Sequence, residues 1–286
     1  MELGICVRDL PAAEVARLGR FAEDHGYAEI YVPDIRGGLA DPSVPISGRD
    51  AFTSLGAMFA ATSTVRGAVG VAAVIFHHPV PLALTAATLQ EQSDGRFTLG
   101  VGISHAESAR KLGVEFPRSP MATMGEWLDA LRHRRDEGLL FGGGWPIMVG
   151  ALGPRMMALG ATDADGVVLN WLTPEHAGVS VNEIRTAAGP DRSPRTVLYV
   201  RISPAVAVRT DAVNYDALGN YHQHFLNQGL HGPDDIVAGT CLPAADPARA
   251  RDRIAEYRES GLDLLCLYPH GFDEPDRLRL LEAITA

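Results

Sequence analysis

Residues 149–170, VGALGPRMMALGATDADGVVLN, place small residues and a Gly-Pro pair between a short apolar strand and a helix. Gly153 suits the position that caps a helix, and Pro154 suits the first helical position, where its missing N–H needs no partner. A helix that begins here directs free backbone N–H groups and the positive end of its dipole toward one point, which favours an anion such as phosphate. A purely structural strand–helix turn has the same pattern, so this stretch alone leaves both interpretations open.

A second glycine-rich stretch, TLGVGIS, carries Gly100 and Gly102 but does not complete a dinucleotide-binding fingerprint. His105 stands where the third glycine would be, and no acidic residue at a strand end follows about twenty positions later. We therefore expect no standard nicotinamide site, and the P-loop, HExxH and GxSxG motifs are absent as well. The small residues either let a flat or phosphate-bearing ligand approach the backbone or relieve crowding between strands.

The histidines and cysteines of the chain do not indicate a metal site. The pairs His77-His78 and His222-x-His224 have no carboxylate or cysteine arranged beside them, and a metal ion needs such a set of ligands. The 3 cysteines are far apart and show no zinc-binding spacing. This usage is typical of a reducing compartment, so we expect a cytoplasmic protein without a bound metal.

The composition excludes several classes of partner. The 286 residues carry a net charge of −10, which disfavours nucleic acid and anionic membranes. No signal-peptide pattern opens the chain, and the longest apolar run, residues 68–76, is too short to cross a bilayer. A hydrophobic content of 46% provides for a large core. We expect a soluble protein whose substrate is a small molecule.

The elements that must position these residues follow a regular alternation. Apolar, strand-like segments alternate with helical patterns, and several are continuous apolar runs, as expected of parallel strands covered on both faces. The predicted strands span residues 3–7, 28–32, 66–75, 97–103, 147–151, 166–170, 196–208 and 262–268. Eight strands with their helices fit a (β/α)8 TIM barrel, and an open doubly wound sheet is the alternative. No linker divides the chain, so we expect residues 1–286 to form a single domain.

In a barrel, the loops that follow the strands build the active site. The Pro- and Gly-rich stretch 36–48 and the loop-rich stretch 210–247 therefore matter most. His105 follows the fourth strand and could exchange a proton near neutral pH, or it could cap the helix that begins after it. Asp34 follows the second strand and could hydrogen-bond a cofactor ring or cap the loop.

Two long motifs closely resemble the luciferase-like family of flavin- and deazaflavin-dependent oxidoreductases. The first, HHPVPLALTAATLQEQSDGRFTLGVGIS, has that family's His-Pro after a strand, its Ala-rich helix, its Ser-x-Gly-Arg-Phe and its Leu-Gly-x-Gly strand. The second is the opening stretch, with its strand, Gly-Pro, helix and Ala-Asp-Gly strand. GYAEIYVPD and YRESGLDLLCLYPHG also match, so the resemblance covers most of the chain in order.

This resemblance implies a (β/α)8 barrel that binds coenzyme F420 or FMN at its C-terminal mouth. It favours the anion site, in which Ala151, Leu152 and Gly153 would hold the cofactor phosphate at the helix N-terminus. It also implies a cis peptide bond, not preceding a proline, near Gly70-Val71 in the third strand, behind the ring system. The residues expected to contact the cofactor are Asp34, Gly70, Val71, Gly102, Ile103, Ser104, Ala151, Leu152, Gly153, Pro154, Asn170 and Trp171.

The resemblance implies the catalytic residues less completely. In the deazaflavin branch the second strand often ends in Asp-His, and an acid often follows the fourth strand. Asp34 matches the Asp, but Ile35 stands in place of the His and His105 in place of the acid. That acid–base pair is therefore not carried over, and His105 and Asp34 are the candidates for catalysis. His78 is expected to be structural.

The substrate wall differs from that of many relatives, which carry a hairpin where this chain has the short glycine-rich bridge 139–146. The best remaining lid or wall is residues 214–232, with His222, His224 and Phe225. The expected substrate wall contains no cluster of arginines that would indicate a phosphorylated substrate. Arg36 and Arg201 are isolated candidates for binding a substrate phosphate.

We expect an F420-dependent oxidoreductase that transfers hydride to or from a small organic substrate. One alternative is an FMN-dependent monooxygenase that receives reduced flavin from a partner reductase. The other is a flavin-binding barrel without catalytic activity. Barrels of this family often pair, so a homodimer is a further expectation.

Overall fold

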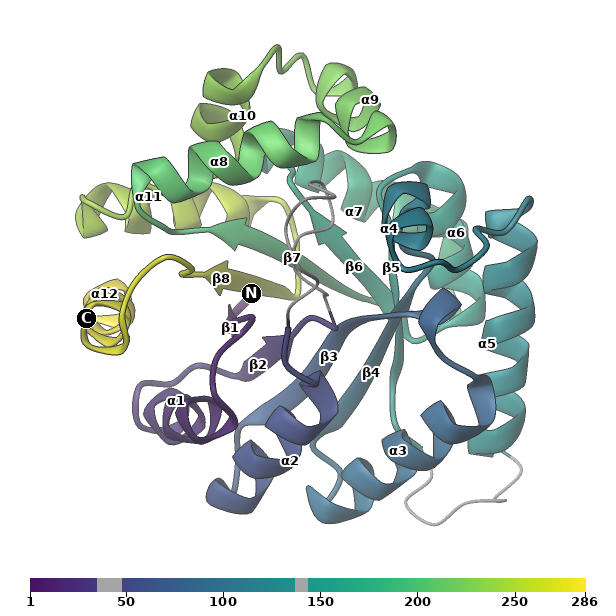
Figure 1. The fold of residues 1–286 in the computed structure, drawn as a ribbon. Coiled ribbons are helices and arrows are strands. Elements are labelled where there is room, and N and C mark those ends of the chain that lie inside the picture. The colour runs from purple at the N-terminus through teal and green to yellow at the C-terminus, as the bar shows by residue number, and fades with distance from the viewer. Residues whose placement is uncertain (35–47, 137–143) are drawn as a thin grey trace.

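A computed structural model describes residues 1–34, 48–136 and 144–286. Its eight parallel strands form a closed barrel in sequence order, and β8 closes the barrel against β1 (Figure 1). The expected (β/α)8 barrel is therefore confirmed. The strands are β1 (Glu2–Cys6), β2 (Glu29–Val32), β3 (Arg66–Ala73), β4 (Phe97–Gly102), β5 (Ile147–Gly150), β6 (Gly166–Asn170), β7 (Arg195–Arg201) and β8 (Leu264–Tyr268).

Helices surround the barrel, and α8, α9 and α10 stand apart from the ring as a separate group beyond β7 (Figure 1). The helices are α1 (Ala12–Asp24), α2 (Ala51–Ala61), α3 (Pro79–Gln92), α4 (Ala106–Lys111), α5 (Pro120–Asp136), α6 (Pro154–Asp163), α7 (Pro174–Ala188), α8 (Ala205–Asp216), α9 (Gly219–Asn227), α10 (Pro233–Thr240), α11 (Pro247–Glu259) and α12 (Glu274–Thr285). None of the described helices is both long enough and apolar enough to cross a bilayer.

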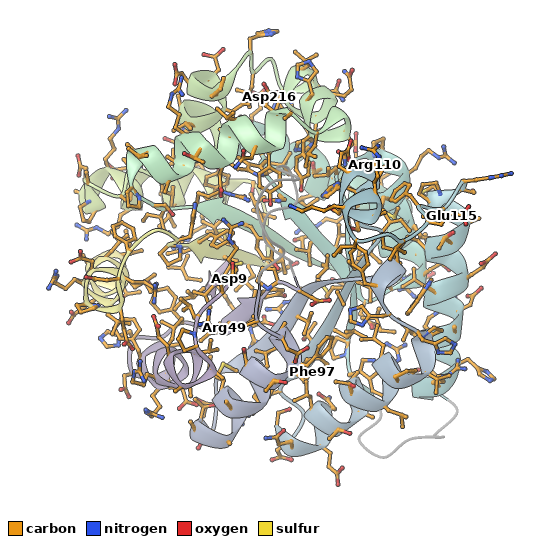
Figure 2. All side chains as sticks on the ribbon, in the orientation of Figure 1. Asp9, Arg49, Phe97, Arg110, Glu115 and Asp216 are labelled. Atoms are coloured by element: carbon orange, nitrogen blue, oxygen red, sulfur yellow. The ribbon has the colours of Figure 1, made fainter. Side chains whose placement is uncertain are left out.

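Two layers of apolar side chains stabilise the barrel. Met148, Cys266 and three tyrosines, Tyr31, Tyr199 and Tyr268, belong to the cluster that fills its interior. A larger cluster packs the outer faces of the strands against the helices. Figure 2 shows the side chains that fill the space between the strands and the surrounding helices. Because both faces of each strand are covered, the strands are continuous apolar runs, as parallel barrel strands usually are.

Strand β3 carries an irregularity that faces the barrel mouth. The peptide bond between Gly70 and Val71 is cis, as expected from the family resemblance, and the register of β3 against β4 shifts at this point. Only glycine fits position 70, because an added Cβ would lie 1.8 Å from Tyr199 Oη and 2.4 Å from Tyr31 Cδ1. The Tyr199 hydroxyl donates a 2.9 Å hydrogen bond to the Gly70 carbonyl.

The glycines of β4 make room for this irregularity. A Cβ at Gly100 would lie 2.4 Å from the carbonyl oxygen of Val69, and a Cβ at Gly102 would lie 2.8 Å from Val71 Cγ2. Two interpretations of Gly100-x-Gly102 were open, and these contacts support the one in which the glycines relieve crowding between strands. Gly102 also lies on the wall of the cavity described below.

The predicted strand 196–208 is too long. Strand β7 ends at Arg201, and helix α8 begins directly after Pro204. The apolar run AVAV continues the composition of the strand, so composition alone does not reveal the change of element. Val208 and Ala212, which lie one helical turn apart, are both buried on the inner face of α8, which is the helical period.

The stretch 210–247, expected to be rich in loops, is mostly helical. It contains the end of α8 and the whole of α9 and α10, whose apolar faces share a small cluster that includes Phe225 and Ile236. Each helix is too short to repeat the helical period of apolar residues clearly, so the sequence pattern did not indicate a helix. The predicted stretches 36–48 and 139–146 lie mostly outside the described residues.

Candidate active site

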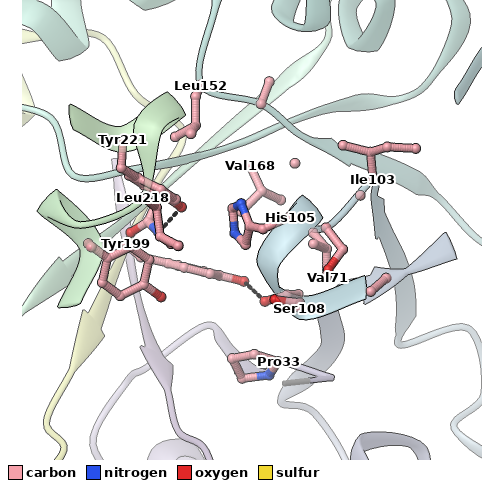
Figure 3. Close-up of a pocket in the computed structure, with 18 of the residues that line it drawn as sticks. Pro33, Val71, Ile103, His105, Ser108, Leu152, Val168, Tyr199, Leu218 and Tyr221 are labelled. Atoms are coloured by element: carbon pink, nitrogen blue, oxygen red, sulfur yellow. Dashed lines mark hydrogen bonds between the residues drawn. The ribbon is translucent and has the colours of Figure 1, made fainter. Parts of the chain in front are cut away.

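The strand ends open into a cavity of about 690 Å³ at the C-terminal mouth of the barrel, a volume typical of small-molecule sites. Strand ends and helices α8 and α9 form its wall (Figure 3). Eleven of the residues expected from the sequence line it, namely Asp34, Gly70, Val71, Gly102, Ile103, Ser104, His105, Ala151, Leu152, Gly153 and Asn170. The candidate residues from five different strands, β2 to β6, thus meet in one place.

Two of the expected residues, Pro154 and Trp171, do not line the cavity. Pro154 occupies the first turn of α6, where it sets the direction of the helix. Trp171 is 1% exposed and packs edge-on against Phe225, with ring centroids 5.8 Å apart. The guanidinium carbon of Arg201 lies 3.8 Å from the Trp171 ring centroid, so Trp171 supports the wall from behind.

Unusual backbone conformations gather at the mouth. Asp9, Ser104 and Trp171 each follow a barrel strand, and each has a positive φ, at 60°, 71° and 56°. Arg49 donates a hydrogen bond to the carbonyl of Asp9, and Figure 2 labels both residues. Left-handed conformations of residues other than glycine are uncommon and cluster at functional sites. This backbone evidence independently indicates the same region of the molecule.

The N-terminus of α6 forms one corner of the cavity. Gly153 is the N-cap residue, and its carbonyl accepts hydrogen bonds from the N–H groups of Met156 and Met157 at 3.1 and 3.0 Å. The Ala151 N–H is already used by the Val168 carbonyl at 3.0 Å, so this residue contributes only its small side chain.

Three backbone N–H groups of this corner remain for an anion. Among the described residues, no acceptor takes the N–H of Leu152, Gly153 or Arg155. A Cβ added at Gly153 would have no neighbour within 4 Å, so the space in front of the helix is open. An open helix N-terminus with free donors suits a phosphate group.

His105 lies on the cavity wall at the start of α4 (Figure 3). It occupies the N-cap position, but its side chain makes no capping hydrogen bond. Its Nδ1 lies 3.4 Å from the Asn220 side-chain nitrogen, and its ring centroid lies 5.5 Å from that of Tyr221. Burial lowers the pKa of His105, so the imidazole is neutral at pH 7 and can accept a proton.

Asp34 is buried at the edge of the cavity and has a partner that the sequence did not reveal. Its Oδ2 lies 2.6 Å from His77 Nε2, and the His77 ring is edge-on to Phe52. The chain therefore provides a histidine beside Asp34 from the end of β3. The only available signal was the His-His-Pro of the recognised motif. His78 caps α3 by accepting the N–H of Val80 at 3.3 Å, which confirms its expected structural role.

The expected substrate wall, residues 214–232, reaches the cavity through its first half. The residues that line the cavity are Asn214, Tyr215, Leu218, Asn220 and Tyr221. His222 is exposed and lies 2.9 Å from Asp216. His224 faces the carbonyls of Asn170 and Trp171 at 3.1 and 3.0 Å, and burial lowers its pKa. Neither histidine lines the cavity, and Phe225 is buried in the helical cluster.

Arg201 is not isolated, contrary to the expectation from the sequence. Its Nε lies 3.7 Å from Asp211 Oδ2, and Arg8 reaches the other oxygen of the same carboxylate at 3.5 Å. The three residues come from β7, the end of β1 and α8, so no local sequence pattern joins them. Arg36 lies outside the described residues.

The cavity suits a flat organic cofactor with a phosphate group. The α6 corner offers backbone donors, and β3 and β4 present a surface of glycine and small apolar residues. Within the described ranges, no group of three or more His, Cys, Asp or Glu residues is arranged to hold a metal ion. A small-molecule site in the mouth of a (β/α)8 barrel defines the class of protein as a barrel enzyme.

Sequence comparison identifies the family. The model of the luciferase-like monooxygenase family matches residues 5–264, so the chain belongs to this family. An uncharacterized protein of Mycobacterium tuberculosis is 31% identical over 64% of this chain and 77% of that protein. The 5,10-methylenetetrahydromethanopterin reductase of Archaeoglobus fulgidus is 26% identical over 71% of this chain and 64% of that protein. The chain is an oxidoreductase of the luciferase-like class.

Structural comparison gives the same fold. An F420-dependent secondary alcohol dehydrogenase, solved with an F420-acetone adduct, superposes with a TM-score of 0.80 at 17% identity, over 99% of this chain and 98% of the other. The EDTA monooxygenase of Chelativorans sp. BNC1 superposes with a TM-score of 0.74 at 14% identity, over 100% and 92%. The fold is therefore common to deazaflavin-dependent and monooxygenase relatives.

Proposed function

We propose that this protein is a coenzyme F420-dependent oxidoreductase that transfers hydride to or from a small organic substrate. The observation that carries the proposal is the meeting, in one cavity, of the open α6 N-terminus and the surface of glycine and small apolar residues at β3 and β4. Relatives support the choice of cofactor. A putative coenzyme F420-dependent oxidoreductase of Mycobacterium tuberculosis is 28% identical over 59% of this chain and 54% of that protein.

Different parts of the cavity would bind the phosphate and the ring of the cofactor. The N–H groups of Leu152, Gly153 and Arg155 would hold the phosphate of the cofactor. The glycine and small apolar surface formed by Gly70, Val71 and Gly102 would support the ring. When bound, the cofactor supplies the hydride chemistry, and the protein supplies orientation and electrostatics.

In this proposal, His105 is the residue that transfers a proton to or from the substrate. Its neutral imidazole lies on the wall, beside Asn220 and Tyr221, which limit its orientation. General acid–base catalysis requires a group whose pKa lies near the working pH and that reaches the substrate. Asp34 is the second candidate, and His77 fixes its carboxylate at 2.6 Å.

A second candidate function is that of an FMN-dependent monooxygenase. It is favoured by the family model, which describes luciferase-like monooxygenases. In that case a separate reductase would supply reduced flavin to the same cavity. We further propose that the protein acts on a small molecule, that residues 1–286 form a single domain and that it works as a homodimer, as the family resemblance implies.

Equilibrium titration by calorimetry separates these functions. We expect micromolar binding of coenzyme F420 and binding of reduced FMN that is about tenfold weaker or worse. The reverse preference would assign the monooxygenase function instead. Absence of binding by both cofactors would refute both functions and leave a barrel without a flavin-type cofactor.

A further inference from the structure

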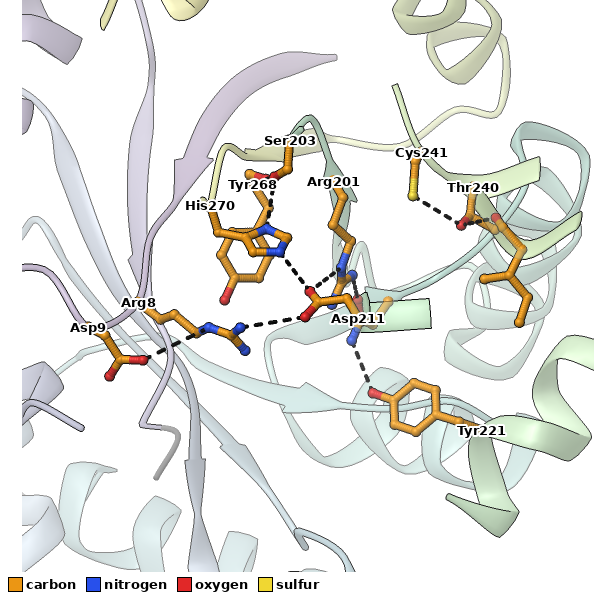
Figure 4. A network of polar contacts seen from close by, with 12 residues as sticks. Arg8, Asp9, Arg201, Ser203, Asp211, Tyr221, Thr240, Cys241, Tyr268 and His270 are labelled. Atoms are coloured by element: carbon orange, nitrogen blue, oxygen red, sulfur yellow. Dashed lines mark hydrogen bonds and ion pairs between the residues drawn. The ribbon is translucent and has the colours of Figure 1, made fainter. Parts of the chain in front are cut away.

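The cavity has a polar side that the proposed cofactor does not use. The phosphate corner and the ring surface belong to β3, β4 and β5, and the opposite side of the closed barrel is formed by β7, β8 and β1. Figure 4 shows that Arg8, Arg201, Asp211 and His270 meet on this opposite side. A substrate that reacts with the ring has to lie between the two sides.

Arg201 is buried and held by contacts within the protein, although its Nε has no hydrogen-bond partner among the described residues. Its side chain is 1% exposed and hydrogen-bonds the Asn170 amide oxygen. Its guanidinium also stacks over Trp171, with Cζ 3.8 Å from the ring centroid. Arg201 therefore contributes positive charge and rigidity to the wall, but it offers little to a ligand.

Asp211 is the shared carboxylate of this group, and it is only 8% exposed. Its Oδ2 lies 3.7 Å from Arg201 Nε and 3.1 Å from His270 Nε2, and its Oδ1 lies 3.5 Å from Arg8 Nη2. One buried negative charge thus faces two guanidinium groups. The carboxylate of Asp9, 4.0 Å from Arg8 Nε, balances the second guanidinium, so the group is close to electrically neutral while His270 is unprotonated.

Within the described part of the chain, Arg8 is the member of this group whose guanidinium donors are least used. Its side chain is 28% exposed and lines the cavity. Its contacts with Asp211, at 3.5 Å, and with the half-exposed Asp9, at 4.0 Å, are longer than charge-assisted hydrogen bonds of about 2.7–2.9 Å. Nearby acidic groups raise the pKa of Arg8 although burial opposes them, so the guanidinium stays charged.

An apolar surface adjoins this charge. Tyr215 and Tyr221 stand edge to face with ring centroids 4.7 Å apart, and both line the cavity with Leu218. Edge-to-face pairs of this kind present flat apolar area to a ligand. The wall therefore combines one available guanidinium with a surface that suits an aromatic or other flat apolar group.

We propose that this wall binds the carboxylate of the substrate, and that the substrate is a monocarboxylic acid with a flat apolar body. Arg8 pairs with the carboxylate, Asp211 positions Arg8, and Tyr215 and Tyr221 contact the body. A monocarboxylate matches the one guanidinium whose donors are available, whereas a phosphate dianion would bring a second negative charge close to Asp9 and Asp211. The inference rests on the proposed function, because the cofactor defines which side of the cavity remains for substrate.

Calorimetry with benzoate and its neutral counterpart benzamide, without cofactor, tests this inference. We expect benzoate to bind about tenfold more tightly than benzamide or better, and more tightly than phenyl phosphate. Arg8→Met should remove the preference, and Arg8→Lys should restore part of it. The control Arg209→Met removes an exposed guanidinium on the outer face of α8 and should leave benzoate binding unchanged.

Two further titrations locate the anion and separate this inference from the proposed function. Gly153→Asp, which places a carboxylate in the α6 corner, should leave benzoate binding unchanged, and Arg8→Met should leave coenzyme F420 binding unchanged. Equal binding of benzoate and benzamide, tighter binding of phenyl phosphate or loss of benzoate binding in Gly153→Asp would overturn the carboxylate site. If coenzyme F420 still binds in those cases, the proposed function stands without it. Benzoate binding that depends on Arg8 but is not accompanied by F420 binding would support the anion site and overturn the proposed function.

Discussion

Replacing Gly70 with alanine adds one methyl group at a crowded point of the barrel mouth. The new Cβ would lie 1.8 Å from Tyr199 Oη and 2.4 Å from Tyr31 Cδ1, so both rings must move. Overpacking of this kind costs roughly 1–3 kcal/mol. Displacing the Tyr199 hydroxyl also breaks its buried hydrogen bond to the residue 70 carbonyl, at a further cost of roughly 1–3 kcal/mol. We expect Gly70→Ala to lower the free energy of unfolding by roughly 2–6 kcal/mol.

Urea unfolding followed by circular dichroism measures this change. The matched control is Gly125→Ala in α5, where an added Cβ meets nothing within 4 Å and alanine should stabilise the helix by roughly 0.5–1 kcal/mol. A double variant combines Gly70→Ala with Tyr199→Phe, which removes the nearest clashing atom. The loss of unfolding free energy in the double variant should be smaller than the sum of the losses in the two single variants by about 1 kcal/mol. A Gly70→Ala protein within about 0.5 kcal/mol of wild type would refute the packing argument.

Three further predictions address capping, pH dependence and proton transfer. Asp50→Ala removes the acceptor of the Thr53 N–H at the start of α2 and should cost about 1 kcal/mol in urea unfolding, whereas Asp50→Asn should retain most of that stability; equal losses would contradict the capping role. Burial lowers the pKa of His224 below 6.5, so the unfolded state takes up the proton first and stability should fall as the pH drops below about 6.5; an identical slope in His224→Gln would contradict this. His105→Asn should lower kcat about 100-fold without changing cofactor binding, and an unchanged kcat would exclude His105 from proton transfer.

The barrel could be predicted from the sequence because its strands are continuous apolar runs separated by helical patterns. This signal is physical, since strands covered on both faces must be apolar throughout. It failed at residues 196–208, where the apolar start of α8 follows β7 with only a short connection. There, the buried pair Val208 and Ala212 follows the helical period, but it is too short a repeat to outweigh the composition.

The helix cap of the site could also be predicted, because the N-cap at Gly153 depends on neighbours in the sequence. The irregularity at Gly70-Val71 was expected only from the family resemblance. What Gly100 and Gly102 do could not be decided locally. It depends on the backbone of Val69 and the side chain of Val71, which reach them from the neighbouring strand.

Pairs that form across the barrel mouth could not be predicted. Asp34 and His77 are 43 positions apart, and the pairing of Arg8 with Asp211 joins the end of β1 to α8. Nothing in either local stretch indicates the partner, because strand order brings these residues together only when the barrel closes. The partners of Asp34 and Arg8, the residues proposed for catalysis and substrate binding, therefore required the three-dimensional structure.

The central claim is that a cofactor phosphate rests on the N-terminus of α6, and the dissociation constant of coenzyme F420 from Gly153→Asp tests it most directly. Neither Gly153 nor the control position Gly125 has a neighbour within 4 Å of an added Cβ, so both substitutions add the same charge without a clash. We predict that Gly153→Asp weakens binding about tenfold or more, or about 1.4 kcal/mol, whereas Gly125→Asp binds like wild type. Equal affinity of the two variants for coenzyme F420 would contradict the account.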